Sequence, residues 1–324
     1  MVAPSLSILA GSSILSATYH RKSLRLSAAP CSITFVRDFS SISSIGLRRA
    51  VLDTGRSRIS GTAAFASLEG TELLMEPKKV EVFDTEEDLA TSLARYTADL
   101  SEKIVQERGI FTVVVSGGSL FKFLGKLVDS PYIDTIAWGK WHIFWVDERV
   151  VPKDHDDSNY KLAYDKFLSK VPIPPGNVYA INDALPAHGA AEDYETCLKH
   201  LVQNGILGQS TTSGFPKFDL MLLGMGPDGH VASLFPGHDL LSENHKWVAC
   251  ITDSPKPPPE RITFTFPVIN SSSYIALVVS GSSKSDIVER ALGKNRHPEL
   301  LPVQMVSPEG ELTWFLDKGA ASKL

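Results

Sequence analysis

An aspartate and a histidine lie two residues apart in a glycine-rich turn that follows an apolar run. The run is DLMLLG (219–224), and the turn after it contains Asp228 and His230. A histidine can act as a general base near neutral pH, and a neighbouring carboxylate can orient the ring or raise its pKa. Glycines at 224, 226 and 229 would let the chain turn sharply. We therefore predict a catalytic Asp228–His230 pair at a strand end.

Two other apolar runs end in residues that suit an anion. The first run, TVVV (112–115), is followed by Ser116, Gly117, Gly118 and Ser119. The second, IALVV (275–279), is followed by SGSSK (280–284), which ends in Lys284. Glycines let backbone N–H groups approach an oxyanion closely, and serine hydroxyls add donors. The pattern predicts two anion cradles.

Charged residues accompany two further runs. IFWV (143–146) is followed by Asp147, Glu148 and Arg149, and Arg261 lies at the start of another run. With the cradles, the two arginines predict a site for a phosphate or carboxylate group, supported by Asp147 and Glu148. The Walker and Rossmann glycine spacings are absent, so a nucleotide is not expected.

Three other interpretations of these residues stay open. Asp228 could cap a following helix, with His230 a structural hydrogen-bonding residue. DHDDS (154–158) with His142 resembles a metal cluster but has no ligand periodicity. Ser116 follows a strand as an esterase nucleophile does, but VSGGS lacks the GxSxG spacing.

The elements that must position these residues alternate between β-rich and helical segments. Strands are predicted at VEVF (80–83), TVVVS (112–116), HIFWVDE (142–148), VYAI (178–181), DLMLLG (219–224), WVACI (247–251), ITFTF (262–266), YIALVVS (274–280) and LTWFL (312–316). Helices are predicted at 85–109, 119–127, 159–168, 190–205 and 283–292, and HVASLF (230–235) is also compatible with a helix.

This alternation predicts an α/β fold: a central, largely parallel sheet with helices on both faces. Ligands of such sheets bind beyond the carboxyl ends of the strands, where the polar residues above are found. We expect one domain with a single sheet system over 79–317. A small subdomain over 178–215 is the alternative organisation.

Charge is divided unevenly along the chain. Residues 1–68 contain eight Lys/Arg and two Asp/Glu, a net charge of +6, which leaves 24 basic and 35 acidic residues, or −11, in the remainder. An acidic body without a basic stripe is a poor nucleic-acid binder. No apolar stretch reaches the roughly 18 residues of a membrane span. Neither nucleic acid nor membrane is a predicted partner.

The first 68 residues are rich in serine and arginine and poor in acids, which is typical of organelle transit peptides. The abundance of serine favours a plastid. We predict a disordered plastid transit peptide over 1–68, with AAFAS (63–67) as the region of processing, followed by a linker over 69–78. A disordered regulatory tail is the alternative.

Residues 318–324 are predicted to form a flexible tail. Its final Ser322, Lys323 and Leu324 match a peroxisomal address, so a peroxisomal import receptor is a predicted partner and delivery to both organelles is expected. The body contains two cysteines, Cys197 and Cys250, without CxxC spacing. They indicate a reducing compartment, with neither a disulfide framework nor a zinc knuckle.

The motifs together resemble those of a known family. In chain order they are SGGS, WVDERVVP, DHDDSNY, LLGMGPDGHVASLFPG, ERITFTFPVIN and GSSK. This series resembles that of the 6-phosphogluconolactonases and covers about residues 79–317. With the leader, the chain looks like a plant plastid member.

The resemblance implies an α/β fold related to glucosamine-6-phosphate isomerase/deaminase. It implies hydrolysis of 6-phospho-D-glucono-1,5-lactone to 6-phosphogluconate, in the oxidative pentose phosphate pathway that supplies NADPH, without metal or cofactor. His230 would activate water, and Asp228 would orient or polarise His230. Arg149, Lys284 and the loop 116–119 would hold the phosphorylated sugar acid, with Arg261 as a further candidate.

The related isomerase/deaminases are the alternative within the superfamily. They have a glutamate that partners the histidine where this chain has Phe235, and a tyrosine where it has Arg149. An apolar wall in place of the glutamate suits hydrolysis better than enolisation. A catalytically silent sugar-phosphate sensor is the alternative from another class, and the intact Asp228 and His230 count against it.

Overall fold

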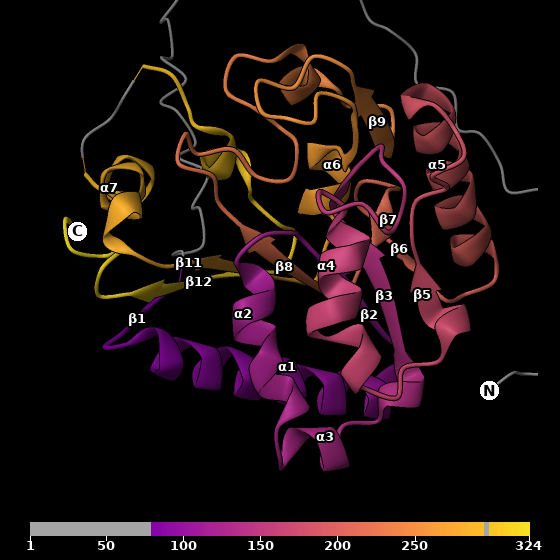
Figure 1. The fold of residues 1–324 in the computed structure, drawn as a ribbon, viewed down its shortest axis with the longest axis horizontal. Helices are drawn as coiled ribbons and strands as arrows, with labels where there is room; N and C mark the ends of the chain where they lie inside the picture. The colour runs from indigo at the N-terminus through magenta and orange to yellow at the C-terminus, as the bar shows by residue number, and fades with distance from the viewer. Residues whose placement is uncertain (1–78, 295–297) are drawn as a thin grey trace, which may run out of the picture. The chain divides into compact units, whose positions relative to one another are not determined.

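A seven-stranded parallel sheet forms the centre of the fold (Figure 1). The computed structural model describes residues 79–294 and 298–324, which belong to one compact unit. The strands lie in the order β1 (Lys79–Phe83), β12 (Glu311–Asp317), β11 (Tyr274–Val279), β8 (Leu220–Gly224), β2 (Phe111–Val115), β3 (Trp141–Trp145) and β5 (Val178–Tyr179). Every neighbouring pair is parallel, so the prediction of a largely parallel sheet is confirmed.

The central strands are apolar because both of their faces are buried. Successive residues of β2 contribute to different cores: Val113 and Val115 pack on one side of the sheet and Val114 on the other. In β8, Leu222 and Leu223 divide in the same way. This two-residue period is that of a strand, and it leaves only the strand ends free to present polar side chains.

Helices cover both faces of the sheet (Figure 1). One face is covered by α1 (Glu86–Arg108), α2 (Leu120–Leu124) with the 3-10 turn at 125–128, and α4 (Asn159–Lys166). Helix α1 begins after Thr85, whose side chain accepts the N–H of Asp88, and ends at Gly109 with φ 76°. The other face is covered by α5 (Ala187–Gln203), α6 (Phe266–Asn270) and α7 (Ser285–Leu292). The short α3 (Tyr132–Thr135) lies in a connection.

The prediction of a single sheet is wrong, because a second, antiparallel sheet consists of β4 (Asp147–Arg149), β10 (Arg261–Phe264) and β9 (Val248–Ile251). The run 142–148 therefore divides between two sheets. Val146 joins them: its N–H donates to Val115 O, and its carbonyl accepts from Phe264 N. Helix α5 packs against β9 while β5 pairs with β3, so 178–215 is not a separate subdomain. A two-stranded ribbon pairs β6 (Gly208–Gln209) with β7 (Pro216–Lys217).

The segment HVASLF (230–235) is not helical, so the helix considered for it is wrong. It forms turns, with Val231 bridged to Leu234 and Ala232 at φ 51°. Hydrogen bonds to other segments replace helical ones: Ser233 N donates to Thr263 Oγ1, and Ser233 Oγ donates to Asp147 Oδ2 over 2.8 Å. The segment is thus tied to the antiparallel sheet.

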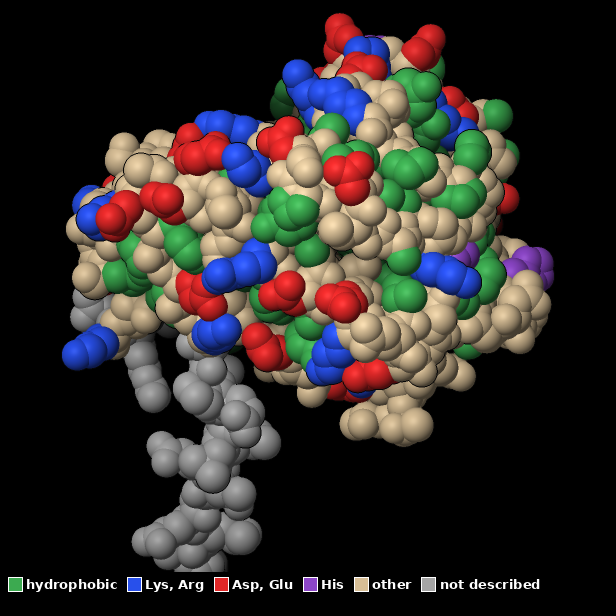
Figure 2. Space-filling model, turned by 90° about the horizontal axis from the view of Figure 1, so that it is seen from below, with side chains coloured by type: hydrophobic (Ala, Val, Ile, Leu, Met, Phe, Trp, Pro, Cys, Tyr) green, Lys and Arg blue, Asp and Glu red, His purple; other side chains and the backbone are tan. Residues whose placement is uncertain are grey.

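The face that includes α1 has basic and acidic side chains interspersed, with no large patch of one sign (Figure 2). Lys122 and Lys126 pair there with Glu86 and Glu87 of α1. In the part of the chain that the structure describes, no helix is long and apolar enough to cross a membrane.

Residues 318–324 form turns against the body, with Ala320 buried and Lys323 paired with Asp286. These contacts place the segment against the body rather than free of it. The predicted transit peptide and linker, residues 1–78, lie outside the described residues.

A buried carboxylate, Asp219, ties the end of α1 to the sheet. It lies at the amino ends of the strands, away from the polar residues that follow their carboxyl ends. Asp219 accepts Thr112 N and Oγ1 over 2.8 and 2.7 Å and pairs with Arg108 Nη1 at 2.5 Å. Asp219→Ala leaves these donors unpaired, so we expect the free energy of unfolding in urea to fall by roughly 2–3 kcal/mol. The control Asp165→Ala, which removes an exposed partner of Lys161, should change it by less than about 0.5 kcal/mol. Equal effects of the two substitutions would contradict the structural role of Asp219.

Candidate active site

Polar residues from several strand ends line one cavity of about 230 Å³. It is bordered by the loop 116–119 after β2, by Gly226 and His230 after β8, and by Arg149 and Arg261 of the antiparallel sheet. The position agrees with the rule that ligands of parallel sheets bind beyond the carboxyl ends of the strands. The structure thus brings together most of the residues predicted for the site.

His230 and Asp228 form a hydrogen-bonded pair. His230 Nδ1 lies 2.5 Å from Asp228 Oδ1, and the side chains are 16% and 35% exposed. Nε2 of His230 makes no hydrogen bond within the described residues. When Nδ1 donates its proton to the carboxylate, Nε2 bears the lone pair, which a general base requires.

The turn between Gly226 and His230 builds this pair. Gly226 N donates to His230 O over 2.9 Å, Gly229 N donates to Gly226 O over 3.1 Å, and Gly229 has φ 80°. A Cβ atom at Gly226 would lie 2.0 Å from His230 Nδ1 and Cε1. Glycine is therefore needed at 226 for space and at 229 for conformation. No helix begins at Gly229, so Asp228 is not a helix cap.

Burial and charge set the protonation of the pair. Burial lowers the pKa of His230 below its usual 6.5, although Asp228 acts in the opposite direction. Burial alone would raise the pKa of Asp228, but hydrogen bonds from His230 and Lys256 lower it to about 2. These shifts favour a neutral histidine and a charged aspartate at neutral pH, the protonation states that base catalysis requires.

The loop 116–119, predicted as an anion cradle, lines the cavity between the ends of β2 and β8. Ser116 Oγ accepts Gly224 N over 2.9 Å, which ties the end of β2 to the end of β8. A Cβ atom at Gly117 would lie 1.9 Å from Asn159 Oδ1, and Gly118 has φ 67°. Ser119 makes no capping hydrogen bond to α2. Glycine thus lets the backbone pass close to Asn159 and face the cavity.

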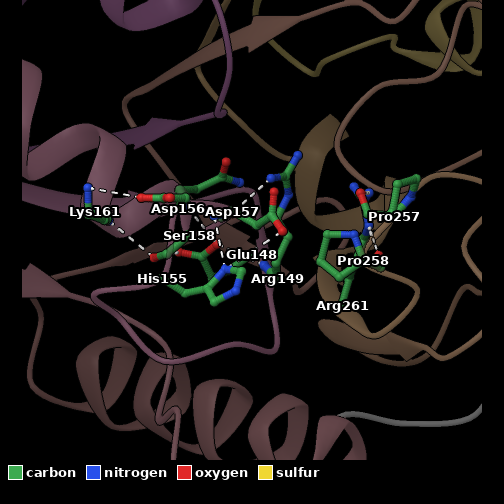
Figure 3. Close-up of polar contacts among 11 residues, drawn as sticks. Glu148, Arg149, His155, Asp156, Asp157, Ser158, Lys161, Pro257, Pro258 and Arg261 are labelled. Atoms are coloured by element: carbon green, nitrogen blue, oxygen red, sulfur yellow. Dashed lines mark hydrogen bonds and ion pairs between the residues drawn. The ribbon is translucent and has the colours of Figure 1, made fainter.

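Two arginines lie opposite each other at the cavity, since Arg149 of β4 pairs in register with Arg261 of β10. Figure 3 shows that Arg149 lies between Arg261 and the loop that contains Asp157. Arg149 Nη1 donates to Asp157 O over 2.7 Å, whereas its buried Nε has no partner. Neither arginine forms an ion pair within the described residues. Burial is the largest cause that lowers the pKa of Arg261, and the positive charge of Arg149 lowers it further. The pair is suited to an anion.

Arg261 is less available to a ligand than Arg149. Its Nε donates to Pro258 O, and its Nη2 donates to the carbonyls of Lys256 and Pro257. The residue is only 3% exposed. Arg149 is therefore the stronger candidate to bind a ligand directly.

The second predicted cradle, 280–284, is occupied by the chain itself. Gly281 N donates to both carboxylate oxygens of Asp317, over 3.0 and 2.9 Å. Lys284 does not line the cavity; its Nζ donates to Met225 O over 2.9 Å. Burial lowers the pKa of Lys284, and the charge of Lys256 lowers it further. Lys284 thus contacts the backbone just before the turn that holds His230.

Asp147 and Glu148 are buried supports of the site. Asp147 holds Ser233, as described above, and also lines the cavity. Glu148 accepts the N–H groups of Arg149, Asn159 and Tyr160 over 2.7–2.8 Å, so it fixes both Arg149 and the start of α4. Burial raises the pKa of Glu148 to about 7 in spite of these hydrogen bonds.

Sequence reasoning missed two residues at the site. Asn159 lines the cavity and donates Nδ2 to Asp147 O over 3.0 Å. Lys256 lies in the segment SPKPPPE (254–260), which has the composition of a loop, yet its Nζ lies 3.1 Å from Asp228 Oδ1. A lone lysine among prolines carries no signal of this contact.

The other interpretations find no support in the described residues. No three His, Cys, Asp or Glu side chains gather there as a metal site would require. His142 bonds Tyr179 over 3.1 Å, whereas His155 of the 154–158 loop lies near Asp157. Ser116 Oγ bonds Gly224 N rather than a histidine.

Comparison with known proteins identifies similar sequences and folds. Residues 84–314 match the family model described as glucosamine-6-phosphate isomerases/6-phosphogluconolactonase. The chloroplastic 6-phosphogluconolactonase 3 of Arabidopsis thaliana is 70% identical over 77% of this chain and 76% of its own. A probable chloroplastic 6-phosphogluconolactonase 4 of Oryza sativa is 67% identical, over 76% of each chain. The crystal structure of 6-phosphogluconolactonase from Thermotoga maritima superposes with TM-score 0.63 at 29% identity, covering 75% of this chain and 100% of that one.

The close packing of His230 on Gly226 can be tested by substitution. In Gly226→Ala we expect the imidazole to move by about 1 Å or more, which breaks the Nδ1–Asp228 hydrogen bond, because the new Cβ cannot share its space. A crystal structure of the variant measures this. Gly125→Ala is the matched control, since Gly125 has φ −54° and open space around its Cβ position. An unmoved imidazole in Gly226→Ala would refute the packing argument.

Proposed function

The chain belongs to the glucosamine-6-phosphate isomerase/6-phosphogluconolactonase family, and we propose that it hydrolyses 6-phospho-D-glucono-1,5-lactone to 6-phosphogluconate with His230 as general base. One observation carries this proposal: His230, held by Asp228 through Nδ1, lines the same cavity as the loop 116–119 and Arg149. A base and an anion site thus adjoin one small space. The names of the relatives support the same substrate.

The proposed reaction uses one imidazole twice. Nε2 of His230 takes a proton from water while the water oxygen attacks C1 of the lactone, and Asp228 stabilises the imidazolium that forms. The tetrahedral intermediate then collapses, the bond from C1 to the ring oxygen breaks, and the imidazolium returns the proton to that oxygen. The product acid ionises and releases a proton to solvent. Water is the only co-reactant.

The phosphate of the substrate is proposed to lie against the loop 116–119 and Arg149. The guanidinium N–H groups of Arg149 that have no partner in the protein are proposed to bond phosphate oxygens, and the buried charge of Arg261 adds to the attraction. Binding at a distance from the reacting carbon supplies energy that fixes C1 near His230. Lys284 contributes through its charge near Asp228 rather than from the wall of the cavity.

The environment of His230 favours hydrolysis over sugar isomerisation or deamination. The ring of Phe235 packs against the imidazole at a centroid distance of 4.7 Å. This apolar wall stands where the isomerase/deaminases carry a second proton-transferring carboxylate. A hydrolase that moves one proton out and back needs no such relay.

We propose a plastid as the location of the enzyme, because two relatives of high identity are named chloroplastic. The leader that would direct it there falls outside the described residues. Delivery to peroxisomes through residues 322–324 stays a prediction.

The proposal is tested by acid release from freshly prepared 6-phosphogluconolactone, measured above the spontaneous rate. We expect rapid hydrolysis by the native protein and a fall in kcat of at least about 100-fold in His230→Ala, since general bases contribute roughly 10²–10⁴-fold. The matched control is His188→Ala, whose histidine also neighbours a carboxylate, Glu192, but is 69% exposed on α5. It should retain full activity. A native protein that does not exceed the spontaneous rate would overturn the function, and an active His230→Ala would overturn the role of the histidine.

A further inference from the structure

A lysine outside every predicted site contacts both members of the Asp228–His230 pair. Lys256 Nζ lies 3.1 Å from Asp228 Oδ1 and 3.2 Å from His230 Nδ1. Its side chain is 35% exposed, so the ammonium is partly shielded from water. It approaches from the segment 254–260, whereas the pair lies in the turn after β8.

The backbone that presents Lys256 is held by several hydrogen bonds. Arg261 donates to the carbonyls of Lys256, Pro257 and Pro258 over 2.9–3.0 Å (Figure 3 shows Arg261 beside the two prolines). Ser254 Oγ accepts Lys256 N over 3.2 Å and donates to Lys256 O over 2.8 Å. The buried Arg261 thus uses three hydrogen bonds to hold this one loop, and these bonds fix the backbone position of Lys256.

Charged groups from five segments act on the imidazole, either directly or through a neighbouring side chain. Asp228 lies in its own turn, Asp147 in β4, and Lys256 in the 254–260 loop. Lys284, at the start of α7, interacts electrostatically with Lys256 and Asp228. Arg261 of β10 lies over the ring of Phe235, and this ring packs on His230. Lys256 is the cation in direct contact with the imidazole nitrogen.

We propose that Lys256 is a positioning residue of the hydrolase, which fixes the Asp228 carboxylate and keeps His230 unprotonated for base catalysis. The inference rests on the proposed function. Lys256 acts through the pair rather than on the substrate, and Arg261 acts in turn through the loop that carries Lys256. This assigns Arg261 a role beyond that of an anion ligand.

The electrostatic part of the role has a definite sign. Burial is the largest cause that lowers the pKa of His230, Asp228 and Asp147 raise it, and Lys256 lowers it further. Removal of the lysine charge should therefore raise the pKa of His230. Because the neutral imidazole is the base, activity is lost as the pH falls through this pKa, and the acid limb of the pH profile should move to higher pH.

The test compares Lys256→Met with Lys256→Arg in the full-length protein. In Lys256→Met we expect the acid limb of kcat/KM to move up by about half to one pH unit, which corresponds to a roughly three- to tenfold loss at pH values below both pKa values. Lys256→Arg keeps the charge and should leave the limb within about 0.2 pH units of the native position. A lysine that only stabilised its loop would change thermal unfolding without moving this limb.

A matched control is available in Lys161→Met. Lys161 has the same 35% side-chain exposure and a carboxylate partner, Asp165, at 3.1 Å, but it lies on α4. Its removal should leave the pH profile unchanged. Equal shifts in Lys161→Met and Lys256→Met would show a general charge effect and overturn the proposal.

A second measurement separates this inference from the proposed function. NMR titration of isotopically labelled His230 reports its pKa without any substrate. We expect this pKa to be higher in Lys256→Met than in the native protein, and an unchanged value would overturn the role of Lys256. If the native protein lacked lactonase activity but the pKa moved as expected, the function would fail while the coupling of Lys256 to His230 stood.

Discussion

The hydrogen bond between His230 Nδ1 and Asp228 Oδ1 is the interaction around which the site is arranged. Gly226 leaves room for the imidazole, Lys256 holds the carboxylate from a second segment, and Phe235 closes one side of the ring. Each contact limits where the ring can turn, and Nε2 makes no hydrogen bond within the described residues, as the proposed base requires. Burial of the ring then favours its neutral form. The main sheet supplies the turn, and the antiparallel sheet supplies the arginines.

Much of this arrangement could be predicted because it depends on local rules. Apolar runs marked the strands, and the carboxyl ends of parallel strands must meet at one edge, so polar residues after different runs were expected to lie together. This reasoning placed Asp228, His230 and the loop 116–119 at one site, and the cavity confirms that His230 and the loop adjoin. Glycine at 229 was expected to permit a sharp turn, and its φ of 80° confirms it.

The rest depends on contacts that a single sequence does not display. Val146 divides an apparent strand because its two backbone groups bond different sheets. The glycine-rich segment 280–284 looked like a second cradle, but Asp317, 36 residues away, accepts the N–H of Gly281. Lys256 reaches the catalytic pair from a loop without periodicity. In each case tertiary hydrogen bonds decide the outcome, and local composition carries no trace of the partner.

In the proposed reaction one cavity holds both ends of the substrate: phosphate at the loop 116–119 and Arg149, and the reacting carbon at His230. A crystal structure of the native protein with 6-phosphogluconate tests this most directly. We predict phosphate oxygens within hydrogen-bond distance of the loop amides and Arg149, and the C1 carboxylate within that distance of His230 Nε2. A product bound with its phosphate at Lys256 and Lys284 and its C1 carboxylate remote from His230 would contradict the account.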